Sequence, residues 1–419
     1  MTQFLITAIG SYGDVHPMVG LASALAARGH RVKIITNPYF EDVVAGTGVE
    51  LLPLGTRDDY IELSRHPDLW HPVRGPKFVL SLAAARFLRP LYELLLANYL
   101  PGETVFCAHA LDFASRLAGE KLATPTASVL LAPGILWSLH DSPRLKGTLL
   151  GPRVPRWMKQ AQFWIADRFF VLPLLGPPLN ALRKELGLAP VRRIFQHWLY
   201  ETDLIIGLFP VWFGPPQPDW PPNTQTFGFP LWDSPNDKPL ADDLLTFLAA
   251  GSPPIAFSPG SANNEAHQFF AAAADACARL NRRGILLTKY DHQLPAALPD
   301  SVRHFGFVPL SKLLPRTAAL VHHGGIGSCA QGLAAGVPHI VRPMSYDQFD
   351  NSRRLVQLGV AQEISVRKFT GQTIADTLAP MLDSISTRCR ELAARCDGPS
   401  ALGAACDALE RLAESRSAR

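Results

Sequence analysis

Two short segments of the C-terminal half carry the residues best suited to chemistry. The first spans 322–328, with the sequence HHGGIGS, and follows the apolar run 317–321, which is typical of a buried strand. Its glycines allow a tight turn and let a ligand approach the backbone closely. The helix-forming sequence 328–335 comes next, so the free N–H groups of a first helical turn would lie beside histidines. Such an arrangement suits a phosphate or diphosphate.

The second segment contains Asp347 and Gln348, after another apolar run at 339–341. A carboxylate accepts hydrogen bonds, and a primary amide both donates and accepts them. This pair can therefore hold the hydroxyl groups of a sugar. A diphosphate site in one segment and a hydroxyl site in the other together indicate a nucleotide sugar.

A loop near the N-terminus offers a different kind of residue in a similar setting. Residues 10–17 (GSYGDVHP) lie between the apolar run 3–9 and a helix predicted over 18–28, and a second strand is predicted over 31–36. This β-loop-α-β unit opens a doubly wound parallel sheet, in which ligands bind beyond the carboxyl ends of the strands. The loop lacks a GxGxxG fingerprint and carries a carboxylate that would repel a pyrophosphate, so we interpret it as a catalytic edge.

Asp14 is the leading candidate for a general base in this loop. A general base must be unprotonated and within hydrogen-bond reach of the attacking hydroxyl, which a carboxylate facing a semi-apolar cleft can satisfy. Alternatively, Asp14 caps a helix that begins near Pro17, because aspartate is a preferred cap and proline suits a first turn. His16 is the rival base, and the two side chains could also act together.

These motifs resemble a known enzyme family. The segment 307–351 is similar to the donor-binding signature of the family 1 glycosyltransferases, and 10–17 resembles the first loop of the bacterial branch of that family. Four further segments are similar to the glycolipid-forming rhamnosyltransferases of this branch: 68–70, 193–195, 209–213 and 228–231. The resemblance implies an α/β chain with the GT-B fold, in which two Rossmann-like, doubly wound parallel-sheet domains face each other across a cleft.

Length and resemblance together predict the domain organisation. A chain of 419 residues is too long for one ordinary core. We expect residues 1–215 to form an acceptor-binding domain and 216–387 a nucleotide-sugar-binding domain, with the proline-rich segment 209–223 as the linker. The last helix, about 388–419, is expected to cross back onto the N-terminal domain.

The resemblance also assigns roles in donor binding. By this similarity His323 contacts the diphosphate, Phe307 stacks on the nucleotide base, and Asp347 and Gln348 hold the sugar hydroxyls. Gln331 stands where the family has a glutamate that grips the ribose, which leaves both UDP and dTDP open. The full expected donor set is Gly13, Gly260, Ser261, Phe307, Val308, His323, Gly324, Gly325, Gly327, Ser328, Gln331, Asp347 and Gln348.

The same resemblance implies an inverting displacement. Asp14 takes the place of the histidine that deprotonates the acceptor in plant members. The strand expected over 104–109 carries His109 where those enzymes carry an aspartate that orients the histidine. An aspartate base needs no partner to fix a tautomer. No Asp-x-Asp motif lies near the donor segments, so we expect neither a metal nor a cofactor. The acceptor oxygen would attack the anomeric carbon opposite the diphosphate, assisted by positioning and electrostatic stabilisation.

The acceptor is expected to be hydrophobic, because all 8 tryptophans precede residue 233. Aromatic residues interrupted by prolines and glycines favour an adaptable apolar cleft for a lipid or an aromatic or terpenoid aglycone, although filling a core explains many of them equally well. The expected acceptor contacts are Trp70, His109 and Trp137. The basic, amphipathic segment 144–159 suits either an anionic membrane surface or a solvated loop.

Composition argues against two classes of protein, nucleic-acid binders and proteins with membrane-spanning helices. A net charge of +4 argues against a dedicated nucleic-acid binder, and no apolar run reaches the roughly 18 residues of a membrane-spanning helix. The 6 cysteines are scattered without a CxxC motif, which predicts free thiols, and the N-terminus does not read as a signal peptide. We therefore expect a cytoplasmic monomer or weak dimer, with peripheral membrane contact as an option. An NAD-dependent oxidoreductase and a non-catalytic nucleotide-sugar-binding protein remain the alternatives.

Overall fold

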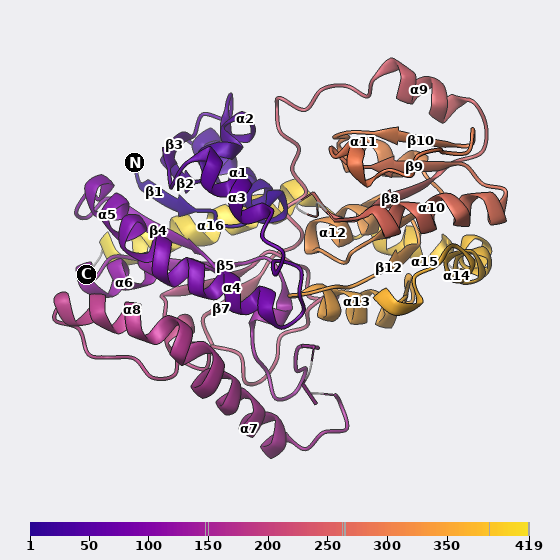
Figure 1. The fold of residues 1–419 in the computed structure, drawn as a ribbon. Helices are drawn as coiled ribbons and strands as arrows, with labels where there is room; N and C mark the ends of the chain where they lie inside the picture. Colours follow the sequence, from indigo (N-terminus) through magenta and orange to yellow (C-terminus); the bar gives the residue numbers. More distant parts are fainter. Residues whose placement is uncertain (147, 150, 262, 264, 385, 418–419) are drawn as a thin grey trace. The chain divides into compact units, whose positions relative to one another are not determined.

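A computed structural model of the protein shows two compact α/β units, each built on one parallel sheet (Figure 1). The structure describes residues 1–146, 148–149, 151–261, 263, 265–384 and 386–417. Unit 1 consists of Met1–Asn236 and Gly398–Arg419, and unit 2 of Asp237–Asp397. The α/β class with two Rossmann-like sheets is therefore confirmed.

Unit 1 is built on a 7-stranded sheet in which each neighbouring pair is parallel. In sheet order its strands are β3 (Glu50–Pro53), β2 (Arg31–Thr36), β1 (Gln3–Thr7), β4 (Thr104–His109), β5 (Thr126–Leu130), β6 (Leu204–Gly207) and β7 (Thr224–Thr226). Its α-helices are α1 (Tyr12–Ala27), α2 (Glu41–Val44), α3 (Arg57–Ser64), α4 (Arg74–Leu82), α5 (Leu88–Asn98), α6 (Ala114–Leu122), α7 (Arg156–Ala166), α8 (Leu172–Glu185) and α16 (Gly398–Ser417).

Unit 2 repeats this architecture with a 6-stranded parallel sheet. Its strand order is β10 (Val302–Phe305), β9 (Gly284–Leu287), β8 (Ile255–Ser258), β11 (Ala319–His322), β12 (His339–Val341) and β13 (Ala361–Glu363). The α-helices are α9 (Asp242–Ala249), α10 (His267–Leu280), α11 (Leu310–Leu313), α12 (Ile326–Ala335), α13 (Gln348–Gln357), α14 (Gly371–Ser384) and α15 (Ser386–Ala393).

Each sheet has one place where the chain order reverses, and the chemistry-bearing segments lie there. In unit 1 the reversal falls between β1 and β4, and in unit 2 it falls between β8 and β11. The loops that leave neighbouring strands at such a point run to opposite faces of the sheet and open a crevice at its carboxyl edge. The predicted loop 10–17 follows β1, and the predicted segment 322–328 begins at the end of β11.

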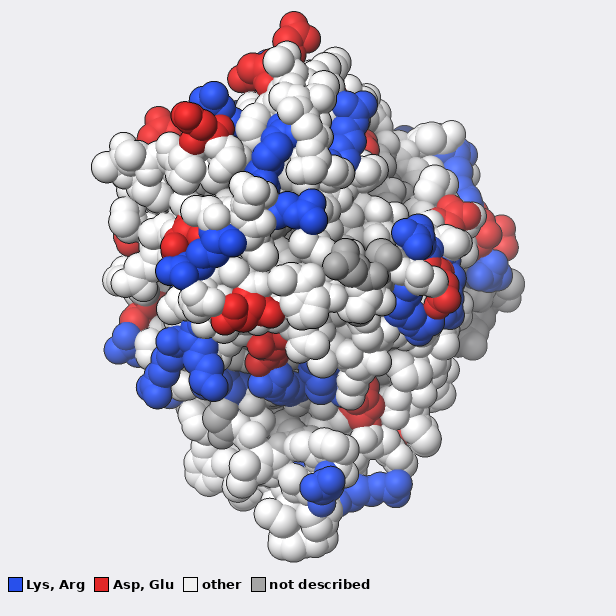
Figure 2. Space-filling model, turned by 90° about the vertical axis from the view of Figure 1, so that its right-hand side faces the viewer, with Lys and Arg blue, Asp and Glu red and all other residues white. Residues whose placement is uncertain are grey.

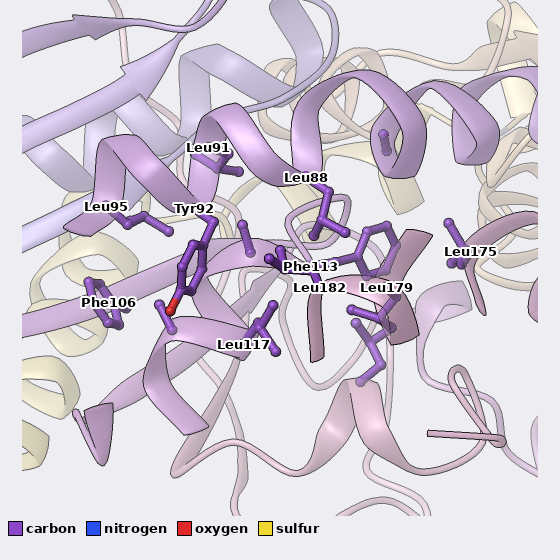
Figure 3. Packing of buried hydrophobic residues seen from close by; sticks show 14 of the residues in the cluster. Leu88, Leu91, Tyr92, Leu95, Phe106, Phe113, Leu117, Leu175, Leu179 and Leu182 are labelled. Atoms are coloured by element: carbon purple, nitrogen blue, oxygen red, sulfur yellow. The ribbon is translucent and has the colours of Figure 1, made fainter. Parts of the chain in front are cut away.

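A large apolar cluster packs against the unit 1 sheet and buries some of the aromatic residues of the N-terminal half (Figure 3). Leu88, Leu91, Tyr92 and Leu95 of α5 pack with residues of α6 and α8 and with Phe106 of β4. All of these side chains are buried. Tyr92, Phe106, Phe113 and Trp198 therefore fill a core.

The proline-rich segment 209–223 is part of unit 1, so its interpretation as the interdomain linker is wrong. Phe209 and Phe213 are buried, with 0% and 2% exposure, and strand β7 follows them and pairs with β6. Phe213 also packs edge-to-face on Phe229 at 5.2 Å. The two units meet in sequence at Asn236, whose side chain donates to the main chain of Asp42 and Ala45 at 2.9 and 2.7 Å.

The C-terminal helix α16 belongs to unit 1, while α15 belongs to unit 2 (Figure 1). Arg28, just after α1, clamps α16 by donating to Asp407 at 2.6 Å, to Glu410 at 2.8 Å and to the Gly403 carbonyl at 2.9 Å. None of the described helices is both long and apolar enough to cross a membrane. All six cysteines are free thiols.

Candidate active site

In unit 1, Asp14 lies in the first turn of α1, at the reversal point of the sheet. Helix α1 begins at Tyr12, earlier than the predicted start, because Ser11 and Asp14 form a reciprocal cap, and Pro17 is inside the helix. Asp14 Oδ2 accepts from the Ser11 N–H at 2.7 Å and from its hydroxyl at 3.2 Å. Asp14 therefore caps the helix through one oxygen, and its other oxygen, Oδ1, remains for a second role.

The Oδ1 atom of Asp14 faces His109 at the end of β4. The distance from His109 Nε2 is 3.6 Å, longer than a hydrogen bond but within reach of an ion pair. The Leu111 N–H donates to His109 Nδ1 at 3.4 Å, which assigns the proton of the neutral ring to Nε2, on the side of Asp14. The His109 side chain is 3% exposed and that of Asp14 is 35% exposed, so the carboxylate is the member that a ligand can reach.

Thr7 and Asp112 hold His109 in place. The Thr7 hydroxyl donates to Asp112 Oδ2 at 2.6 Å and accepts from the His109 N–H at 3.0 Å. Asp112 lies just before α6, not inside it, and its Oδ1 accepts from the amides of Ala114 and Ser115 at 2.8 Å. Burial raises the pKa of Asp112. These groups are saturated by one another, so they position the strand end and do not offer contacts to a substrate.

Two glycines of this loop shape the position of Asp14. Gly10 has a φ of +140°, and a Cβ there would lie 2.2 Å from Asp14 Oδ2, so the carboxylate can fold back only over a glycine. The Gly13 N–H donates to the Ser11 hydroxyl at 3.3 Å. This amide therefore serves the helix cap, which gives no support to the expected contact of Gly13 with the donor.

His16, the rival base, lies on another side of α1. Residues two apart on a helix are separated by about 200° around its axis, so the side chains of Asp14 and His16 do not share a face. The His16 ring lies 5.6 Å from that of Tyr12 and 5.9 Å from that of Trp232. This geometry does not support joint action of Asp14 and His16 on one hydroxyl.

The residues expected to bind an acceptor lie in different parts of unit 1. Trp137, after β5, stacks between Phe163 of α7 and Phe195, with centroid distances of 4.9 and 5.7 Å. It also borders a cavity of about 220 Å³ that Tyr200 helps to line. Trp70 is half-buried in a turn before α4. Of the expected acceptor residues, His109 lies next to Asp14.

In unit 2, His323 follows β11 and lies against the loop that follows β8. Strand pairing places His322 opposite Ser258. The His323 ring lies between Gly260 and Gly325, since a Cβ would come within 2.9 Å of ring atoms from Gly260 and within 2.5 Å from Gly325. Burial lowers the pKa of His323 to about 4, although its hydrogen bond to the Ser258 main chain acts to raise it. At neutral pH the ring is therefore uncharged and can serve an anion only through a hydrogen bond.

Helix α12 begins directly beside this histidine. Gly325 is its N-cap, no side chain caps its first turn, and its first internal bond runs from the Cys329 N–H to the Gly325 carbonyl at 3.0 Å. The N–H groups of Gly327 and Ser328 precede that bond and point out of the helix end. Gln331 lies one turn further on the side of Ser328. An uncapped helix start combines free amides with positive partial charge, as a diphosphate requires.

Gly324 shapes the turn and does not present its backbone to a ligand. Its φ is +93°, a conformation that favours glycine. Its N–H donates to His322 Nδ1 at 3.2 Å, and its carbonyl accepts from Asn351 Nδ2 at 3.0 Å. Both main-chain groups are used within the fold, so the expected contact of Gly324 with the donor finds no support.

His322 is fully buried and forms a pair with His339 that sequence analysis does not reveal. His322 Nε2 lies 3.1 Å from His339 Nδ1. Because His322 Nδ1 accepts from Gly324, its Nε2 carries the proton and donates to His339. The His339 ring packs on Gly332, where a Cβ would lie 2.4 Å from His339 Cε1. The sequence offers one signal for this packing, a glycine at 332 that leaves room for the ring of His339. That signal is weak, because segment 332–339 otherwise has the sequence of an ordinary helix and strand.

Acid is expected to destabilise unit 2 through this pair. Burial lowers the pKa of His322 well below its unfolded value of 6.5 and that of His339 to about 3. The unfolded state therefore takes up protons first as the pH falls. Stability that is present above about pH 6.5 should be lost toward about pH 3, by about 1.4 kcal/mol per pH unit for each histidine.

Hydrogen exchange of the β11 and β12 amides between pH 7 and 4.5, corrected for intrinsic exchange, measures this slope. We expect a smaller slope in His339→Gln than in the wild-type protein. Equal slopes in the two proteins would show that the pair does not carry the acid sensitivity.

Gln348 occupies the first turn of α13 and is 3% exposed. Its Oε1 accepts from the N–H groups of Met344 and Ser345 at 2.9 and 3.1 Å. The oxygen therefore ties down the preceding turn, and the amide nitrogen is the atom left for a sugar hydroxyl. Tyr346, inside this turn, has a φ of +56°, which is uncommon for a residue other than glycine.

Asp347, the N-cap of α13, is held by Asn351. Asn351 Nδ2 donates to Asp347 Oδ2 at 2.7 Å and also to the Gly324 carbonyl at 3.0 Å. This one amide links the expected sugar site to the glycine turn. The spacing of Asp347 and Asn351 by one helical turn is the sequence signal that could identify Asn351 as a supporting residue.

The remaining expected donor contacts follow strands β10 and β8 of the unit 2 sheet, which are separated by β9. Phe307, after β10, is 64% exposed, so its ring is accessible for stacking. Val308 packs on a small apolar cluster that contains Leu313. Ser261 is exposed and follows Gly260, whose φ is +100°. In the part of the chain that the structure describes, no group of three or more His, Cys, Asp or Glu residues is placed to hold a metal ion.

Two family models match the chain, one in each unit. Residues 4–126 match the Glycosyltransferase family 28 N-terminal domain. Residues 274–398 match the model described as Erythromycin biosynthesis protein CIII-like, C-terminal domain. The first range contains Asp14 and His109, and the second contains His323, Asp347 and Gln348.

Similar proteins extend over most of the chain. Glycosyltransferase GtfE of Amycolatopsis orientalis is 28% identical over 375 residues, with 85% of each chain covered. The O-mycaminosyltylonolide 6-deoxyallosyltransferase of Streptomyces fradiae is 28% identical, with 99% of this chain and 98% of the relative covered.

Solved structures share the fold. The glycotransferase of kitacinnamycin superimposes with a TM-score of 0.73 at 20% identity, over 98% of this chain and 99% of its own. The glycosyltransferase VinC in complex with dTDP gives a TM-score of 0.70 at 20% identity, over 99% and 100% of the two chains. At this level of identity the comparison establishes the architecture of two Rossmann-like units.

Proposed function

Since this chain belongs to the glycosyltransferases of the GT-B type, we propose that it moves a hexose or deoxyhexose from a UDP- or dTDP-sugar to a hydroxyl of a hydrophobic acceptor. Glucose and rhamnose are the proposed sugars, since both carry hydroxyl groups that Asp347 and Gln348 could hold. The observation that carries the proposal is the neutral His323, set between two glycines beside the uncapped start of α12.

The donor half of the proposal uses unit 2. The amides of Gly327 and Ser328 and the ring of His323 would take the diphosphate, whose negative charge the helix start stabilises as the glycosidic bond breaks. Asp347 and the amide nitrogen of Gln348 would hold the sugar hydroxyls. Phe307 would stack on the base, and Gln331 would contact the ribose. Similarity to a protein solved with dTDP favours testing dTDP-sugars first.

The acceptor half uses unit 1. Asp14 Oδ1 would take the proton of the acceptor hydroxyl, whose oxygen attacks the anomeric carbon as the bond to the diphosphate breaks, inverting the configuration. His109, with a proton on Nε2, orients this carboxylate and stabilises its charge. The start of α12 would stabilise the negative charge of the leaving diphosphate, a role that a metal ion plays in other enzymes. The proposed reaction is therefore metal-independent.

The acceptor class and the setting remain predictions. The motifs that resemble glycolipid-forming rhamnosyltransferases favour a lipid acceptor, and an aromatic or terpenoid aglycone is the alternative. We expect the enzyme to act in the cytoplasm as a monomer or weak dimer. Neither an NAD-dependent oxidoreductase nor a non-catalytic binder is favoured, since loop 10–17 lacks GxGxxG and Asp14 and His109 meet beside it.

A thermal-shift titration tests the proposed donor class. A ligand that binds only the folded protein raises its melting temperature as the concentration exceeds the dissociation constant. We expect shifts with dTDP or UDP and none with NAD or GDP. Detection of a new glycoside with inverted anomeric configuration by NMR would then establish the reaction. A shift with NAD alone, or with none of the four ligands, would overturn the proposal.

A further inference from the structure

Helix α7 and the helical turn that continues it, η4 (Asp167–Val171), expose several large apolar side chains and bury two charged ones. The inward face carries two charged groups beside the buried Phe163 and Val171: Lys159 and Asp167 are 3% and 2% exposed. Lys159 Nζ donates to the Leu139 carbonyl at 3.1 Å. The two oxygens of Asp167 accept from the amides of Phe195 and Gln196 at 3.3 and 3.1 Å. Internal hydrogen bonds thus satisfy the buried charges.

The outward face is apolar and large. Trp157, Trp164 and Ile165 are 71%, 48% and 44% exposed, and Phe169 and Phe170 are 57% and 45% exposed. On a helix, positions 157, 164 and 165 lie on one side. Five large apolar side chains on one exposed stretch exceed the scattered single residues of an ordinary surface, so they mark an interaction site.

The exposed charged residues of segment 142–172, which contains this apolar face, are all positive. In 142–172 the single acidic residue is the buried Asp167, whereas Arg153, Arg156 and Arg168 are exposed. Lys77 of α4 lies over the Phe170 ring at 4.9 Å, and Arg168 lies over the Phe169 ring at 5.4 Å. At the level of α7 in Figure 1, the lower end of the surface visible in Figure 2 shows Lys or Arg colour on an otherwise uncharged area.

We propose that this face, formed by residues 153–170 with Lys77, docks the protein on an anionic phospholipid bilayer. Tryptophan and phenylalanine enter the boundary between headgroups and acyl chains, and the flanking arginines and lysine bind lipid phosphates. A second copy of the chain fits this face poorly, because a symmetric pairing would bring two basic rims together. The sequence suggested a membrane surface at 144–159, whereas the proposed surface is formed mainly by α7 and η4. Residues 147 and 150 of the suggested segment lie outside the described residues.

A cavity next to the face fits the same partner. It has a volume of about 630 Å³ and borders Trp164, Arg168, Arg192 and Arg193. Leu172, Pro177 and Val191 contribute apolar walls. Guanidinium groups beside apolar walls match a phosphate that is joined to an acyl chain.

Vesicle co-sedimentation of the full chain tests the docking without any sugar substrate, so its outcome is independent of the proposed transferase activity. The probes are vesicles of phosphatidylcholine alone and of phosphatidylcholine with phosphatidylglycerol. We expect sedimentation with the anionic vesicles only and its loss at high salt. No binding to anionic vesicles, or equal binding to both kinds, would overturn the proposal.

Matched variants locate the binding surface. Trp157→Ser with Phe169→Ser should lower partitioning onto anionic vesicles roughly tenfold or more, and Arg153→Glu with Arg156→Glu should do the same.

The control is Val356→Ser with Val366→Ser, at positions 39% and 47% exposed in unit 2, which should bind as wild type. Far-UV circular dichroism and dTDP binding should be unchanged in every variant. Unchanged partitioning of the aromatic variant, or a wild-type dimer in solution that this variant disrupts, would contradict a bilayer as the occupant.

Discussion

Asp14→Asn is expected to lower kcat by roughly 10²- to 10⁴-fold, with little change in diphosphate affinity. The amide keeps an oxygen that can accept from the Ser11 N–H, so the start of α1 should survive. The asparagine amide cannot take a proton from the acceptor hydroxyl. It also lacks the negative charge that faces His109 in the wild-type protein. Steady-state kinetics with a dTDP- or UDP-sugar, together with dTDP titration calorimetry, measure the two effects separately.

The chain contains a matched control for the capping role of Asp14. Asp59 occupies the same N3 position in the reciprocal cap of α3, where its Oδ2 accepts from the Thr56 N–H at 2.7 Å, and it also pairs with Arg86. Asp59→Asn should cost stability comparable to or greater than Asp14→Asn while kcat stays near the wild-type value. Full activity in Asp14→Asn would exclude Asp14 as the base and direct the search to His16.

Gly325→Ala is expected to weaken diphosphate binding by about 10- to 100-fold. The added Cβ would lie 2.5 Å from His323 Nε2 and 3.0 Å from Cε1. The ring cannot retreat toward Gly260, where the space is also less than a methyl group requires. The imidazole therefore has to leave its place beside the start of α12, where it is expected to bind the diphosphate. Isothermal titration with dTDP and UDP gives the change in affinity.

Two comparisons make this result specific. Gly251→Ala places its Cβ 3.5 Å from Arg283 in an ordinary contact, so it should bind dTDP as the wild-type protein does. In a double-mutant cycle, Gly325→Ala should cost much less in a His323→Ala background, because the clashing ring is gone. Additive losses in the cycle would show that Gly325→Ala acts by another route, such as a shift of α12.

Local sequence was sufficient for the elements that carry the site. The strands expected over 3–9 and 317–321 are present as β1 and β11, and a chemistry-bearing segment follows each of them. Hydrophobic runs specify buried parallel strands, and glycine, serine and aspartate specify the turn and helix start that follow. These signals depend on residues close together in the chain, so Asp14, His323 and the start of α12 could be placed from the sequence, with helix boundaries off by several residues at α1.

Partners that come from distant parts of the chain were decided by the tertiary structure. His109 reaches Asp14 because β4 pairs beside β1, and His322 reaches His339 because β12 pairs beside β11. The same holds for 209–223, whose prolines indicate a linker although Phe209 and Phe213 are buried in unit 1. It holds also for α7, where Lys159 is buried while Trp157 and Trp164 are exposed. Periodicity shows that a helix has two faces, but only the surrounding packing decides which face is buried. The sequence alone therefore determined what each residue could do, and strand order and packing determined which residues do it together.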